Sequence, residues 1–109
     1  MRVVIDDERH SRHCEALGKQ LVEETDWALQ NAGIAEVDRR RELARAVLFR
    51  VCAVLDGGAH GGTLDGNPIA PFVGFYNGGD TEEPMVPVDG SSMHAVLDDL
   101  VNEHFIARS

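Results

Sequence analysis

A glycine-rich stretch divides the chain into two parts that differ in periodicity and in charge. The stretch VLDGGAHGGTLDGNP, residues 54–68, contains five of the eleven glycines. Apolar residues before it follow helical spacing, whereas β-branched and aromatic runs typical of strands come after it. Glycine adopts left-handed backbone conformations easily, so a cluster of this density interrupts regular structure. The stretch therefore predicts a joint between a helical half and a sheet-bearing half.

Two helices are predicted before the joint. Apolar residues recur every three or four positions from about residue 8 to 32, and Gly33 supplies a stop. Gly18 lowers helix propensity within this segment, which indicates a close packing partner. Asp38 is the expected N-cap of a second helix that ends near Leu55. The second helix is apolar almost all round in its later half, so we expect it in the centre of the domain, antiparallel to the first.

Two strands and a final helix are predicted after the joint. The segments IAPFVGFY (69–76) and PMVPV (84–88) are the expected strands of a hairpin, and the prolines favour a long loop over a tight turn. Residues 2–5 offer a third short strand. The final helix opens at Asp89-Gly90-Ser91-Ser92, with its serines as caps. Its apolar residues follow one helical face: Met93, Val96, Leu97, Leu100, Val101 and Phe105.

These elements predict an α+β fold in the order (β)ααββα, as a single domain over residues 1–109. A helical hairpin is followed by a β-hairpin and a C-terminal amphipathic helix, with the helices packed on a small antiparallel sheet. A two-stranded hairpin alone is barely stable, so we expect the third strand, or strand pairing across a dimer, to support it.

The charge is strongly asymmetric and excludes several classes of partner. The formal net charge is −9, and residues 56–109 contain nine acidic residues against one basic residue, Arg108. Nucleic acid and anionic membranes repel such a surface. No apolar run approaches the roughly 20 residues of a membrane-spanning helix. Acidic residues follow Val3-Val4-Ile5 at once, which is unlike a signal peptide. Two cysteines, expected as reduced thiols, favour a cytoplasmic protein.

The joint itself is the first candidate site. It lacks the lysine of a phosphate-binding loop, and its helix-before-strand context is the reverse of a dinucleotide fingerprint. Two interpretations stay open. Either its glycines end the second helix and turn the chain, or Asp56, His60 and Asp65 bind a small ligand or a metal, with Tyr76 or Asn77 reaching the site from the β-hairpin.

A second candidate site is the HSRHC segment of the first helix. His10 shares a helical face with His13 and Cys14, a combination that can chelate zinc with further ligands. The segment lacks a second ligand pair of the CxxC or HExxH kind. The alternative is a solvated first turn with a half-buried cysteine.

Basic and imidazole side chains supply the remaining candidates. The cluster of Arg39, Arg40, Arg41 and Arg45 opposes the macrodipole at a helix N-terminus, and it can contact an anion or a partner. The favoured alternative pairs these arginines with acids of the second half, such as Asp98 and Asp99. The last helix carries two further histidines, His94 and His104, but no nucleophile accompanies them.

Two functional hypotheses follow. The preferred one is a non-enzymatic protein-interaction module, inhibitor-like, immunity-like or regulatory, that forms a homodimer, needs no cofactor, and presents its acidic half to a basic partner. The alternative is a domain that binds a small ligand or a metal, or an enzyme, with its site at the glycine-rich joint, residues 56–67.

Overall fold

The computed structural model describes residues 4–5, 7–57, 62–71, 73–77, 80–86 and 93–108. These residues form an α+β fold, as predicted, with elements in the order β1 (Val4–Ile5), α1 (Asp7–Asn31), α2 (Val37–Leu55), β2 (Thr63–Leu64), β3 (Asn67–Pro68), β4 (Phe75–Asn77), β5 (Asp80–Val86) and α3 (Met93–Ile106). None of the helices in these ranges is long and apolar enough to cross a membrane.

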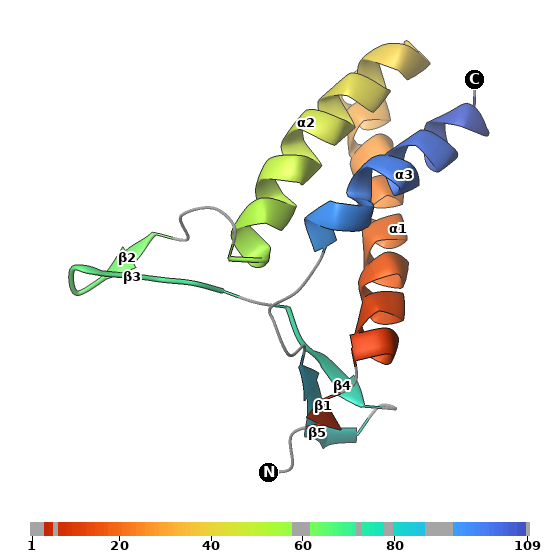
Figure 1. Cartoon of the computed structure of the whole chain (residues 1–109). Helices are drawn as coiled ribbons and strands as arrows, with labels where there is room; N and C mark the ends of the chain where they lie inside the picture. Colours follow the sequence, from red (N-terminus) through yellow and green to blue (C-terminus); the bar gives the residue numbers. More distant parts are fainter. Residues whose placement is uncertain are drawn as a thin grey trace.

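The three helices pack against one another and share one hydrophobic core. α1 and α2 run antiparallel, as expected, and α3 packs against both (Figure 1). Gly33 follows α1 with a φ of 92°, the left-handed conformation predicted for a helix stop. A Cβ atom on Gly18 would lie 2.6 Å from Cδ1 of Leu100, which confirms close packing at this glycine. The buried core comprises Cys14, Val22, Ala44, Leu48, Cys52, Met93, Leu97, Leu100, Val101 and Phe105.

The start of α2 differs from the prediction. Glu36 occupies the N-cap position and makes no side-chain capping bond, whereas Asp38 lies within the first turn. Nη1 of Arg40 donates hydrogen bonds to the carbonyl oxygens of Ile34 (3.1 Å) and Ala35 (2.7 Å). The prediction that Asp38 is the N-cap is therefore wrong. The linker between α1 and α2 is held by hydrogen bonds from the buried side chain of Arg40, and no local carboxylate caps the helix.

α2 lies at the side of the helical layer and not at its centre. Its buried positions, Arg40, Ala44, Leu48 and Cys52, form one stripe. α1 and α3 lie on the same side of α2 (Figure 1), so within the described ranges its opposite surface has no helix against it. The predicted central position is wrong because two neighbouring helices cover only part of the circumference. Four apolar residues of α2 are exposed by 37 to 53%: Val47, Phe49, Val51 and Val54.

A three-stranded sheet in the order β1-β5-β4 packs at the N-terminal end of α1. β5 pairs with β4 antiparallel, through Phe75 and Met85, and with β1 in parallel, through Met85 and Val4. The third strand expected within residues 2–5 is therefore confirmed for Val4–Ile5. Met85 is fully buried.

The boundaries of the β-hairpin differ from those predicted. Of the described residues in the expected strand 69–76, Phe75 and Tyr76 belong to a strand, which continues to Asn77, and the second strand starts at Asp80. Asn77 pairs with Asp80, so the predicted long loop is wrong. The irregularity lies within the ladder instead, as a register shift between Tyr76 and Asn77. Pro84 lies within β5, the central strand, opposite Tyr76 of β4, whereas β1 pairs with β5 at Met85 and Val86.

The glycine-rich joint contains a small hairpin that the sequence analysis missed. β2 and β3 pair antiparallel, and Asp65 and Gly66 between them have φ values of 53° and 81°. Two positive φ values are the requirement of a type I′ turn, for which Asp-Gly is a preferred pair. The hairpin projects away from the helices (Figure 1). Gly57 (φ 76°) ends α2 as expected; Gly58 and His60 lie outside the described residues.

Candidate functional site

Asp56, the first residue of the predicted joint site, caps the N-terminus of α3, which begins 37 residues later in the chain. Its side chain is 1% exposed. Oδ1 accepts a hydrogen bond from the backbone N–H of Met93 (3.1 Å), and Oδ2 accepts one from that of His94 (2.8 Å). Nδ1–H of His94 donates to the same Oδ2 (2.5 Å). The carboxylate thus satisfies free amides at the positive end of α3. Ser91 and Ser92, the expected caps, lie outside the described residues.

The other members of the joint site lie elsewhere. Asp65 is exposed in the turn of the projecting β2–β3 hairpin, whereas Asp56 is buried against α3. Tyr76 is 58% exposed on β4. In the part of the chain that the structure describes, no three His, Cys, Asp or Glu side chains lie close enough to hold a metal ion. His60 is outside that part, so the joint hypothesis stays a prediction.

The imidazole of His10 joins α1 to the segment before β4. Nε2–H donates to the carbonyl oxygen of Val73 (2.6 Å), since a carbonyl only accepts. Nδ1 of the neutral ring then accepts from the thiol of Cys14 (Sγ···Nδ1 3.6 Å). The ring also lies against Phe75, with centroids 5.3 Å apart. His10 is 3% exposed, and both of its nitrogens are engaged in the fold.

His13 lies one turn from this pair but has a different environment. Its Nδ1–H donates to the carbonyl oxygen of Arg9 (2.7 Å), and its ring lies 5.2 Å from that of Phe75. Together with Arg9, Arg12 and Ala16 it lines a hollow of about 350 Å³. The HSRHC segment thus attaches the sheet to α1.

The arginine cluster separates into buried and exposed members. Nε and Nη2 of Arg45 donate to the two carboxylate oxygens of Asp98 on α3 (3.0 and 3.3 Å). This is the predicted kind of pairing with an acid of the second half. Arg39 and Arg41 instead face acids of their own helix, each at 3.7 Å, which are Glu42 and Asp38 respectively. Exposed pairs of this kind contribute little to stability.

Arg40 belongs to a buried ionic cluster that the sequence analysis missed. Its Nε donates to Oδ1 of Asp26 (2.6 Å), and Nε2–H of His104 donates to Oδ2 (2.8 Å). Nε of Arg108 lies 3.5 Å from Oδ2. Burial by itself raises the pKa of Asp26, but hydrogen bonds from His104, Arg40 and Gln30 outweigh burial and hold the pKa below its ordinary value. The cluster joins all three helices.

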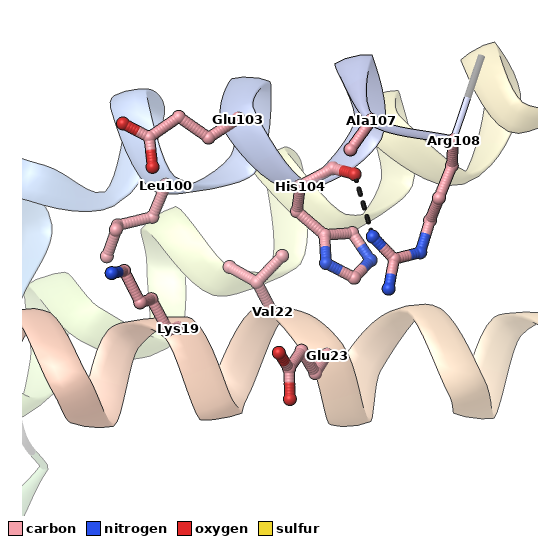
Figure 2. A pocket seen from close by; sticks show the side chains of 8 residues that line it. All are labelled: Lys19, Val22, Glu23, Leu100, Glu103, His104, Ala107 and Arg108. Atoms are coloured by element: carbon pink, nitrogen blue, oxygen red, sulfur yellow. Dashed lines mark hydrogen bonds between the residues drawn. The ribbon is translucent and has the colours of Figure 1, made fainter.

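A pocket of about 230 Å³ lies beside this cluster, between α1 and α3. Figure 2 shows Lys19 toward one end and His104 and Arg108 toward the other. Nη1 of Arg108 donates to the carbonyl oxygen of His104 (3.0 Å). The polar groups at this end already bond to one another or to Asp26, so they serve the packing of α3 on α1.

The largest of these three hollows is a groove between α2 and α3. It has a volume of about 480 Å³ and is lined by Glu42, Arg45, Ala46, Phe49, Arg50 and Asp98. Phe49 is 48% exposed, and its ring meets that of His94 edge-on. The Arg45–Asp98 pair fixes one wall of the groove, while the other wall is the uncovered surface of α2. An apolar floor with charged margins is typical of a protein-contact surface.

Both cysteines are buried in the helical core. Cys14 and Cys52 are free thiols, exposed by 1% and 0%. Burial, followed by the nearby charges of Asp56 and Cys14, raises the pKa of Cys52 to about 11. A thiol with this pKa is protonated at neutral pH and is not a nucleophile.

No protein-family model, curated protein or solved structure matches the chain.

Proposed function

We propose that the protein is a non-enzymatic protein-interaction module whose contact surface is the outer face of α2. This face comprises Glu42, Ala46, Phe49, Arg50 and Ala53. These positions follow the i, i+4, i+7, i+8, i+11 spacing that aligns side chains on one side of a helix. The first four also line the groove against α3.

The observation that carries the proposal is the uncovered apolar surface of α2. A helix that is apolar almost all round is normally covered on all sides. In this fold Phe49, on the outer face, is 48% exposed, and Val47, Val51 and Val54, on the adjacent side of the same helix, are each more than a third exposed. Exposed apolar side chains that gather along one helix mark a site of protein contact. A protein partner on this face explains why the sequence is apolar where the described part of the chain supplies no cover.

Site-specific photo-cross-linking tests the proposal. Phe49 is replaced by a benzophenone amino acid and the variant is irradiated in the cells that produce the protein. The control carries the same group at Trp27, an aromatic residue of α1 that is 65% exposed. We expect a discrete cross-linked protein at position 49 and none at position 27. Absence of a cross-link at 49, or equal yields at both positions, contradicts the proposal.

A further inference from the structure

We infer that the partner on the outer face of α2 is a second copy of this chain, with the two α2 helices antiparallel and crossing at Ala46. The inference rests on the proposed function, because it names the occupant of the same surface. Three features of the described residues carry it: the order of charges along the face, the sizes of its side chains and the area that the chain exposes.

The charges on the outer face are self-complementary. Glu42 and Arg50 lie four residues on either side of Ala46, so each is about 6 Å from it along the helix axis. In an antiparallel pair centred on Ala46, Glu42 of one copy faces Arg50 of the other, and the two-fold axis makes this contact twice. A parallel pair in register would instead place like charges opposite each other.

Both groups are available for such a contact. Among the described residues Arg50 has no ion-pair partner. The carboxylate of Glu42 is 66% exposed and lies 3.7 Å from Arg39, a loose pair within one helix. Loose, exposed pairs contribute little, so exchanging this one for a contact across an interface costs little.

The side-chain sizes fit the same register. Ala46 is exposed and small, so two helices can approach closely where it faces its copy. Three residues further along, Phe49 lies at the edge of the same face, where it contacts the second copy. The ring of Phe49 is 48% exposed, so this contact covers apolar surface that each copy leaves exposed.

The exposed area of the chain is large enough to supply an interface. Its accessible surface is 7103 Å². A compact monomer of 11.9 kDa exposes about 6,000 Å². The excess, about 1,100 Å² over the whole chain with its projecting β2–β3 hairpin included, is of the order of the 800 Å² that each partner buries in a standard interface.

Charge reversal in the full-length protein, measured by sedimentation equilibrium, tests the inference. The wild type is expected to be a dimer. Glu42→Arg and Arg50→Glu each place like charges opposite each other twice, so each should weaken dimerisation about tenfold or more. The double variant restores both contacts and should dimerise like the wild type. The control, Arg12→Glu on α1, removes an equally exposed charge and should leave the dimer unchanged.

Mixing the two single variants sharpens the test. Each copy of Glu42→Arg then faces a copy of Arg50→Glu with opposite charges, so a heterodimer should form where neither variant dimerises alone. A monomeric wild type, single variants that dimerise normally, or a failure of the mixture and the double variant to recover would overturn the inference. If position 49 then cross-links to a different protein, the interaction function stands and only the second copy is excluded.

Discussion

At the residue scale, the carboxylate of Asp26 connects α1 to Arg40 of α2 and His104 of α3. Removing its charge leaves the guanidinium of Arg40 buried without a counter-ion. We expect Asp26→Asn to lower the free energy of unfolding by about 3 kcal/mol at pH 7, as for other broken buried pairs. Urea denaturation measures this loss. Asp38→Asn removes a carboxylate that is 81% exposed and should change stability by less than about 0.5 kcal/mol.

The same carboxylate gives stability a particular pH dependence. Its pKa in the folded protein lies below the ordinary value of about 3.9. The ionised form therefore stabilises the fold fully above that ordinary value, and this contribution is lost as pH falls toward the folded-state pKa. Between about pH 5 and pH 2 we expect Asp26→Asn to lose less stability than the wild type. Equal losses in the two proteins would show that Asp26 does not carry this dependence.

Asp56 provides a second residue-scale test. Its two oxygens accept hydrogen bonds from the amides of Met93 and His94, which begin α3. Asp56→Ala leaves these amides without the cap, so we expect the free energy of unfolding to fall by about 1 to 2 kcal/mol. Asp56→Asn keeps one acceptor oxygen and should lose less. Denaturation of all three proteins decides the matter; an alanine variant as stable as the wild type rules out capping.

At the element scale, the approach of α3 to α1 depends on Gly18. An added Cβ would meet Cδ1 of Leu100 at 2.6 Å, and a branched side chain would push further into the core. We expect Gly18→Val to destabilise the fold by about 2 kcal/mol through overpacking. Ala28→Val is the matched control, because position 28 is exposed on the same helix. Similar melting temperatures for the two variants would contradict this packing.

The sequence predicted the elements whose signals are local. The lengths of α1, α2 and α3 follow from apolar spacing, and Gly33 marks the end of α1 as expected. The β2–β3 hairpin was missed although Asp65-Gly66 carries its signal, because the glycine density around it indicated a loop. The apolar run 69–76 has the composition of a strand, yet of its described residues only the last two pair with β5. Strand pairing depends on which residues of β5 lie opposite, and the run itself does not contain that information.

Contacts between residues far apart in the chain could not be predicted from sequence patterns. Asp26 lies 14 residues from Arg40 and 78 residues from His104, so no spacing rule connects them. The Arg45–Asp98 pair was anticipated only because the second half has surplus acids. The position of α2 at the side of the layer depends on how many helices surround it, which apolar content does not determine.

At the scale of the whole molecule, the chain is more open than its length requires. Its radius of gyration is 15.6 Å, whereas about 13 Å is usual for a compact chain of this size. The projecting β2–β3 hairpin and the one-sided packing of α2 both contribute to this shape (Figure 1). The proposed second copy covers the surface of α2 that this shape leaves exposed.

The most direct measurement of the central claim is disulfide trapping at the proposed crossing point. Cys14 and Cys52 are buried, so a cysteine placed at an exposed position is the reactive thiol. Two small residues facing each other at a helix crossing come within the 4.4–6.8 Å Cα separation, roughly, that a disulfide spans. Under mild oxidation we expect Ala46→Cys to form a covalent dimer rapidly, and Ala28→Cys on α1 to stay monomeric. A monomeric Ala46→Cys protein, or equal trapping at both positions, would contradict the account.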